Sequence, residues 1–146
     1  MPPSSTDPLS QAEARTLHAF AGTMIPASTA YGVPGADDAQ IFADILNSIG
    51  RDLDDVRSAL RRLGAFADLA PERRLQAANA LRAAGGPDVA ALSRVVLLSY
   101  YRDDRVMRSL GQEPRPPFPK GHVVEQGDWS LLDQVKRRAP FYRKVS

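Results

Sequence analysis

The pattern of apolar and polar residues predicts a helix near the start of the chain. Apolar residues recur there three or four positions apart, which places them on one face of a helix: Leu17, Phe20, Ala21 and Met24. Ser10 and Glu13 stand in the order of a capping box, and Pro26 stops the helix because its ring cannot join the hydrogen-bonded ladder. We therefore expect a helix from about Gln11 to Met24.

The next two helices are marked by the same spacing and by the residues that bound them. Asp37 and Asp38 place carboxylates at the start of a helix that we expect from about Asp37 to Ile49, followed by Gly50 as the C′ glycine. A third helix starts at Asp52. The apolar residues of these two helices recur at helical spacing: Ile41, Phe42, Ile45, Leu46, Ile49, Leu53, Val56, Leu60 and Leu63.

Two more helices open on proline, which fits the first turn of a helix. The fourth runs from Pro71 to the glycines at 85 and 86, and we expect its apolar residues to face inward: Leu75, Ala78 and Leu81. The fifth begins at Pro87. Its run Val95 to Leu98 is rich in β-branched residues, as strands are, but the apolar spacing favours a helix buried on most sides. A short turn is expected from about Arg105 to Leu110.

These elements predict an all-α fold: a compact bundle of about five helices, with no strand alternation or hairpin signal. We divide the chain into a flexible N-terminal arm (1–9), a helical domain (10–111) and an extended, proline-rich C-terminal tail (112–146). The tail is too long for an ordinary connection inside a domain, yet it carries large apolar residues that a lone chain would expose. We expect the tail to lie on a partner, with Trp129 and Phe141 as anchors.

Composition adds one further hypothesis. The formal net charge is +2, but residues 120–146 are basic, with a cluster at Lys136, Arg137 and Arg138. Such a cluster suits an acidic partner or a solvated end. The alternative function that it leaves open is that of a basic helical regulator that binds nucleic acid.

Motifs for chemistry are missing. The chain has no cysteine and two histidines that lie far apart in sequence, so it offers no metal-ligand spacing. No G-x-G-x-x-G, Walker A or G-x-S-x-G pattern occurs, which indicates no nucleotide cradle and no nucleophile elbow. Neighbouring carboxylates at 37–38, 54–55 and 103–104 diverge on a helix and are explained by helix capping. We therefore expect no catalytic, cofactor-binding or metal-binding residues in this chain.

Residues Thr23 to Leu46 read TMIPASTAYGVPGADDAQIFADIL. A helix, an I-P break, a short polar loop, P-G-A and an apolar helix with F-x-D-x-L follow one another, and this order resembles the opening of the gluconate 2-dehydrogenase subunit 3 family. A second stretch, LLSYYRDDRVMRSLGQEP, is similar to that family's apolar helix with a tyrosine-containing end, a short turn, L-G and a proline-rich exit. The likeness covers about residues 15–120.

Members of that family are small companion subunits of flavin-dependent sugar and polyol dehydrogenases. The resemblance implies that this chain is not an enzyme by itself but the small subunit of a heteromeric, glucose-methanol-choline (GMC) type oxidoreductase acting on a sugar, glycoside or polyol. FAD is then expected in the large partner subunit, which this chain stabilises and helps to assemble. The expected partner interface comprises Ile25, Pro26, Tyr31, Pro34, Tyr100, Tyr101, Phe118, Trp129, Phe141 and Tyr142.

The location of the protein is a separate expectation. The opening MPPSSTDPLS has no basic or apolar segment typical of an export leader, whereas many relatives in that family carry a twin-arginine leader. No stretch approaches the roughly 20 apolar residues of a membrane span. We therefore expect a cytoplasmic protein without a membrane span, or a periplasmic one only if an exported partner carries it.

Overall fold

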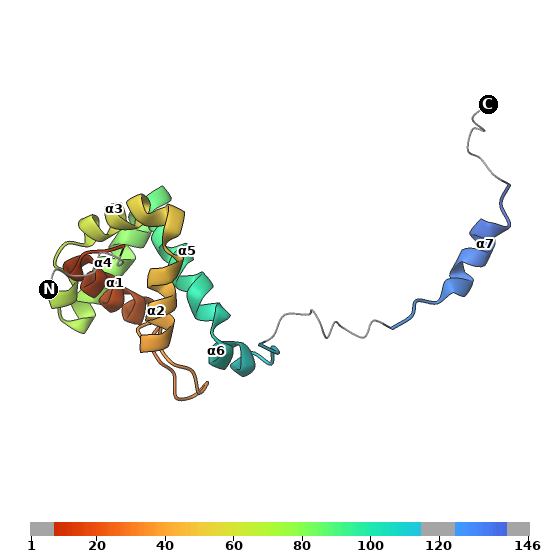
Figure 1. Ribbon diagram of the computed structural model, residues 1–146, viewed down its shortest axis with the longest axis horizontal. Helices are drawn as coiled ribbons and strands as arrows, with labels where there is room; N and C mark the ends of the chain where they lie inside the picture. The colour runs from red at the N-terminus through yellow and green to blue at the C-terminus, as the bar shows by residue number, and fades with distance from the viewer. Residues whose placement is uncertain (1–7, 115–124, 140–146) are drawn as a thin grey trace, which may run out of the picture. The chain divides into compact units, whose positions relative to one another are not determined.

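The computed structural model describes residues 8–114 and 125–139 (Figure 1). They belong to two units, Met1–Pro114 and Arg115–Ser146. The boundary that the sequence suggests, between residues 111 and 112, lies close to the division between these units. Phe118, Phe141, Tyr142 and residues 1–7 of the expected N-terminal arm lie outside the described residues. The expectation of a flexible arm is wrong for its last two residues, because Leu9 is buried in the core and the Arg57 guanidinium donates to the Pro8 carbonyl at 2.7 Å.

The first unit is a bundle of packed helices, as predicted. Its helices are α1 (Gln11–Met24), α2 (Ala39–Ser48), α3 (Leu53–Leu63), α4 (Pro71–Ala84), α5 (Pro87–Arg102) and α6 (Asp104–Ser109). Two 3-10 turns connect them, η1 (Gly50–Asp52) and η2 (Phe66–Asp68). In the part of the chain that the structure describes, the β-type pairing is limited to an isolated bridge between Ser28 and Val33. The all-α prediction is therefore confirmed.

Local sequence signals explain where the helices begin. At the start of α1, the Glu13 amide donates to Ser10 Oγ at 3.3 Å and the Ser10 amide donates to Glu13 Oε2 at 2.8 Å, which completes the predicted capping box. Helix α2 starts at Ala39 rather than at residue 37, because Asp38 is its N-cap and accepts the Gln40 amide at 3.1 Å. Gly50 adopts a φ of 40°, as expected for the glycine that ends a helix.

Helix α5 lies at the centre of the core and packs against α3 and α2, as the ribbon in Figure 1 also shows. The run Val95 to Leu98 lies within α5, which confirms the prediction of a helix rather than a strand. Val95 and Val96 are buried. Leu97 and Leu98 nevertheless face outward, and the helix is buried on fewer sides than expected. The largest fully buried side chains include Phe66, Leu17, Ile41, Ile45, Ile49 and Leu92.

Two sequence-based expectations need correction. Leu75 does not face inward: it is 54% exposed, and Leu81 is the one buried residue of α4. Helix α4 therefore touches the core mainly through its C-terminal half. The expected short turn after α5 is a helix, α6, because Asp103 caps it by accepting the Arg105 amide at 2.9 Å.

The second unit adds a helical segment that the residue pattern did not indicate. It consists of the 3-10 turn η3 (Trp129–Leu132) followed directly by α7 (Asp133–Lys136). Asp128 caps it by accepting the Ser130 amide at 3.0 Å. None of its residues is buried.

Candidate partner interface

The loop between α1 and α2, residues 25–38, turns back on itself and is exposed at its tip. Ser28 and Val33 exchange two backbone hydrogen bonds, each 3.0 Å long, and Gly32 turns the chain at a φ of 62°. This arrangement lifts Tyr31 to the tip, where its side chain is 80% exposed. The sequence therefore places a large aromatic ring in water on a loop that its own backbone bonds hold in place.

The base of this loop is fastened to the helical body. The Ala36 amide donates to the Ile25 carbonyl at 2.9 Å, which closes the loop where α1 ends. The Tyr100 hydroxyl, from α5, donates to the Pro34 carbonyl at 3.2 Å. Burial raises the pKa of the Tyr100 hydroxyl, with further contributions from Tyr101 and Asp103. Tyr100 thus stays a neutral donor at physiological pH and ties the loop to α5.

Arg105 makes a second connection between the loop and the end of α5. Its guanidinium donates to Asp38 at 2.7 Å and 3.2 Å, and to Asp103 at 3.0 Å through two nitrogens. Hydrogen bonds from Arg105 are the main cause that lowers the pKa of both carboxyl groups. One cation therefore joins the N-cap of α2 to the N-cap of α6.

Together these contacts form a shallow aromatic groove, which we call the tyrosine groove. It has a volume of about 230 Å³ and lies between the loop and the α5–α6 corner. Tyr100 and Tyr101 meet edge to face, with ring centroids 5.3 Å apart. Tyr101 is 53% exposed, whereas Tyr100 is buried beneath it. The main lining residues are Tyr31, Val33, Tyr100, Tyr101, Val106 and Leu110.

The structure brings some of the expected interface residues together and separates others. Tyr31, Tyr100 and Tyr101 line the tyrosine groove, and Pro34 accepts the Tyr100 hydrogen bond at its base. Ile25 is the C-cap of α1 and packs, partly buried, against the core; it is not among the residues that line the groove. Pro26 lines a different hollow, and Trp129 belongs to the second unit. The sequence analysis missed Val33, Val106 and Leu110, although Leu110 stands in the L-G pair after α6.

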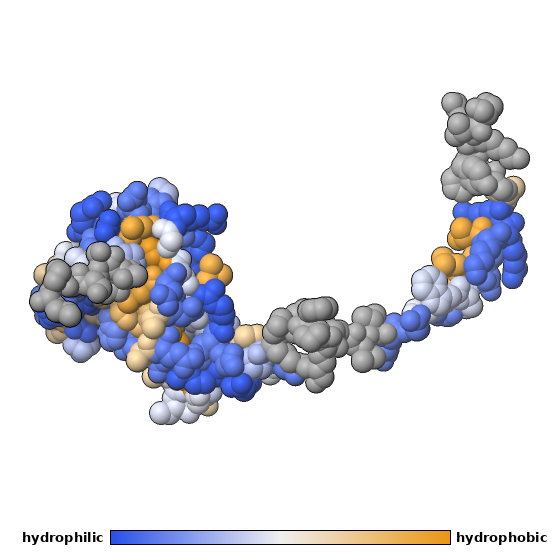
Figure 2. All heavy atoms as spheres, viewed as in Figure 1, coloured by the Kyte–Doolittle hydropathy of each residue, from blue (hydrophilic) through white to orange (hydrophobic). Residues whose placement is uncertain are grey.

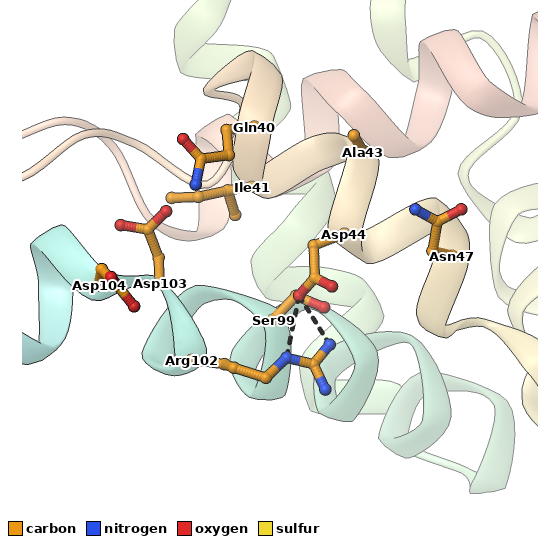
Figure 3. A pocket seen from close by; sticks show the side chains of 9 residues that line it. All are labelled: Gln40, Ile41, Ala43, Asp44, Asn47, Ser99, Arg102, Asp103 and Asp104. Carbon is orange, nitrogen blue, oxygen red and sulfur yellow. Dashed lines mark hydrogen bonds and ion pairs between the residues drawn. The ribbon is translucent and has the colours of Figure 1, made fainter. Parts of the chain in front are cut away.

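A polar hollow of about 420 Å³ lies between α2 and α5 (Figure 3). Asp44 points toward Arg102 in Figure 3, and their oxygen and nitrogen atoms are 2.6 Å apart. The other two carboxylates of the lining, Asp103 and Asp104, pair with Arg105 and Arg108. Each acid of the hollow is therefore engaged by an arginine, and the arrangement presents ion pairs rather than a free acid and base.

A larger hollow of about 750 Å³ lies between α1 and α4. His18 lines it and packs edge to face on Phe42, with ring centroids 4.8 Å apart. Arg15, also in the lining, forms an ion pair with Asp68 at 2.6 Å. His18 thus serves as an aromatic packing residue on the helix face.

Metal sites and membrane spans can be assessed for residues 8–114 and 125–139. No three His, Cys, Asp or Glu side chains among them are arranged to hold a metal ion. No helix within these ranges has the length and apolar character needed to cross a membrane.

The fold and the groove define an all-α helical bundle with an exposed aromatic surface. Comparison of the chain with protein-family models, curated proteins and solved structures finds no match.

The loop under the tyrosine groove depends on a close backbone approach at Gly35, which gives a testable prediction. A Cβ at this position would lie 2.9 Å from the Ala27 amide nitrogen and would also collide with Asp37 Oδ1. We expect Gly35→Ala to lower the free energy of unfolding by about 2 kcal/mol. Urea denaturation followed by circular dichroism measures this loss.

Gly22→Ala is a matched control for the Gly35 variant. The nearest atoms to a Cβ at Gly22 belong to the Asp37 carboxylate, at 2.6 Å, which is the end of an exposed side chain and free to rotate away. Alanine also favours the helix by about 1 kcal/mol. Gly22→Ala should therefore cost much less than Gly35→Ala, and equal losses would contradict the assignment of a backbone clash at Gly35.

Proposed function

We propose that this chain is the non-catalytic small subunit of a heteromeric, FAD-dependent oxidoreductase of the GMC type, acting on a sugar, glycoside or polyol. Its role is to stabilise and assemble the large subunit, which holds the flavin and the catalytic residues. A partner that binds only the folded state of another protein stabilises that state by mass action. This chain itself then needs no cofactor and no catalytic residue.

The observation that carries this proposal is the tyrosine groove. Tyr31 and Tyr101 expose 80% and 53% of their surfaces on a loop and a helix end that are held in place by hydrogen bonds and ion pairs. Tyrosine is enriched among residues that dominate protein interfaces, because it buries a large area at a small entropic cost. A preorganised aromatic surface supports binding to a protein partner.

The position of the groove supports the same assignment. It is built from the two segments that carry the resemblance to the gluconate 2-dehydrogenase subunit 3 family: the I-P…P-G-A loop supplies Tyr31 and Val33, and the LLSYYRDD segment supplies Tyr100 and Tyr101. These short motifs are therefore joined in one surface. The engaged carboxylates of the polar hollow between α2 and α5 are consistent with a role in binding rather than catalysis.

The proposal is tested by co-expression with a flavoprotein. We expect a long reading frame beside this one that opens on G-x-G-x-x-G, and its product should purify with this chain as a stable complex containing FAD. The flavoprotein expressed alone should be less soluble and less active in a dye-reduction assay. Dissociation of the two chains during dilute gel filtration would contradict an obligate subunit.

Substitutions in the tyrosine groove should weaken this complex. We expect Tyr31→Ala and Tyr101→Ala each to raise the Kd about 10-fold or more, because each removes an exposed aromatic contact without disturbing the core. Titration calorimetry measures the change. Leu98→Ala is the matched control: Leu98 is also exposed on α5 but is absent from the groove lining, so its Kd should stay unchanged. Equal effects at Leu98 and Tyr101 would exclude the groove as the interface.

A further inference from the structure

The helical segment of the second unit is organised as a binding element rather than as part of a core. Asp128 caps it, and the Trp129 indole donates to the Gln126 side chain at 3.2 Å. These contacts are local in sequence, and every described residue of the unit is exposed. The segment thus has an ordered start but buries none of its apolar side chains.

One side of this segment is apolar. Trp129 is 64% exposed and Leu131 is 75% exposed, and Leu132 and Val135 are exposed as well. At roughly 3.0 to 3.6 residues per turn these four side chains fall on one side of the axis, while Ser130, Asp133 and Gln134 fall on the other. Figure 2 shows the hydrophobic residues gathered along this short helix. The segment is therefore amphipathic.

The acidic residues of the segment precede its basic residues. Asp128 and Asp133 lie in its N-terminal part, and the basic residues follow at its C-terminal end: Lys136, Arg137 and Arg138. Lys136 forms an ion pair with Asp133 at 3.4 Å, while Arg137 and Arg138 are exposed. This order agrees with the helix dipole and gives the segment an acidic end and a basic end.

A helix of this length is marginal in water by itself. Isolated helices shorter than roughly 12 residues form poorly, because few hydrogen bonds are available to offset the conformational entropy lost in forming the first turn. A fixed N-cap and an apolar side lower the cost of ordering once a complementary surface is present. Short amphipathic helices that dock in apolar grooves of other proteins have this design.

We propose that the segment Asp128–Arg138 is a recognition helix that docks in an apolar groove of the large flavoprotein subunit, with acidic residues of that subunit facing Arg137 and Arg138. This proposal rests on the proposed function and names a second contact surface for the same partner. Trp129, Leu131 and Leu132 enter the groove. The order of the charges sets the direction in which the helix lies in the groove, because a reversed helix would place Asp128 against the acidic residues of the large subunit.

The charges favour a protein groove over a lipid surface. The acids Glu125, Asp128 and Asp133 all precede the basic residues Lys136, Arg137 and Arg138, although the sequence from 120 to 146 as a whole is basic. A uniformly anionic membrane attracts the basic residues but repels the acids at the other end of the same segment. A groove with an acidic rim at one end makes use of the separation of charge along the helix.

The experiment uses the full chain, in which Trp129 is the one tryptophan. Incorporation of 5-fluorotryptophan gives a single ¹⁹F resonance that reports on the recognition helix alone. We expect this resonance to shift and broaden when the unlabelled flavoprotein is added, and to lose its sensitivity to D₂O. Unilamellar vesicles of phosphatidylcholine with phosphatidylglycerol should leave it unchanged.

Variants of the full chain test the two parts of the proposed contact. Trp129→Ala should raise the Kd for the flavoprotein about 30-fold. The double change Arg137→Gln with Arg138→Gln should raise it about 10-fold at low salt and reduce its salt dependence. Gln134→Ser, on the polar side, is the matched control and should not change the Kd.

The outcomes separate this proposal from the proposed function. The flavoprotein could bind while the ¹⁹F resonance does not move and Trp129→Ala binds as tightly as the wild type. That result overturns the proposed recognition helix and leaves the tyrosine groove as the interface. A resonance that shifts with the vesicles and not with the flavoprotein overturns it in favour of a lipid surface. If no flavoprotein binds to any form of the chain, the proposed function fails and the recognition helix fails with it.

Discussion

Replacing Phe66 by alanine should lower the free energy of unfolding by about 4 kcal/mol. The Phe66 ring is fully buried and lies 6.0 Å from the Phe20 ring, measured between centroids. It projects from η2, a 3-10 turn without a side-chain cap, and this turn packs against α1 and α4. Loss of the ring leaves a cavity where three elements meet. The polar contacts that also hold the turn, from Arg15 to Asp68 and from Arg74 to the Ala67 carbonyl, do not fill that cavity.

Urea denaturation followed by circular dichroism at 222 nm is the appropriate measurement, because the sole tryptophan lies in the other unit and does not report on the bundle. Phe66→Leu should cost less, about 1 kcal/mol, and covers the case in which the alanine variant fails to fold. Leu75→Ala is the control. Since Leu75 is 54% exposed, its loss should stay below about 1 kcal/mol, and a larger loss there would show that the core is misplaced.

Arg105→Met should cost about 2 kcal/mol at neutral pH. The substitution keeps the apolar stem but leaves two carboxylates without their cation. The Asp103 side chain is 3% exposed, so its charge would remain poorly solvated. Asp38 and Arg105 are partly exposed, which keeps the cost below that of a fully buried pair. The loop that carries Tyr31 should also loosen, because Asp38 stands at its end.

Arg105→Met should also change how the free energy of unfolding depends on pH. Arg105 holds the pKa values of Asp38 and Asp103 below those of the unfolded chain, which are near about 4. Their contribution is therefore complete above about pH 4 and is lost as the pH falls toward the lower, folded values. We expect the stability difference between wild type and Arg105→Met to shrink between pH 7 and pH 3. Asp88 keeps its own arginine, Arg62, in both proteins, so both retain some acid sensitivity.

Arg108→Met is the matched control for Arg105→Met, since both residues lie on α6. Arg108 pairs with Asp104 at 3.2 Å, but both side chains of this pair are largely exposed. Such a pair on a helix surface is worth roughly 0.5 kcal/mol or less. Equal losses of unfolding free energy in the two variants would contradict the assignment of Arg105 as the residue that connects the caps of α2 and α6. A loss in Arg105→Met that keeps its size at pH 3 would contradict it as well.

The sequence indicates part of the tyrosine groove, whose role as an interface stays a prediction. Tyr31, Pro34, Tyr100 and Tyr101 were named from motifs that are local in sequence. Their assembly into one surface depends on a hydrogen bond between Tyr100 and Pro34, 66 residues apart. No periodicity encodes that pairing. Ile25, expected in the same interface, caps α1 and lies outside the groove lining.

The helices of the bundle follow from local sequence, because each depends on neighbours within one or two turns. Ser10 and Glu13 start α1, Asp38 starts α2 and prolines open α4 and α5. Apolar spacing located most of the core on these helices. The apolar residues of the tail, such as Trp129, were also recognised from composition as too exposed for a lone chain.

Where periodicity is weak, packing between segments distant in sequence decides which apolar residues are buried. Phe66 lies in a short turn with no helical period, yet it is fully buried, whereas Leu75 fits a helical stripe and is exposed because α4 meets the core mainly through its C-terminal half. Arg105 is one arginine among many in the sequence. It becomes the link between two helix caps because the fold brings Asp38, 67 residues away, beside Asp103. Such choices depend on contacts between distant segments, and these exist only once the helices have packed.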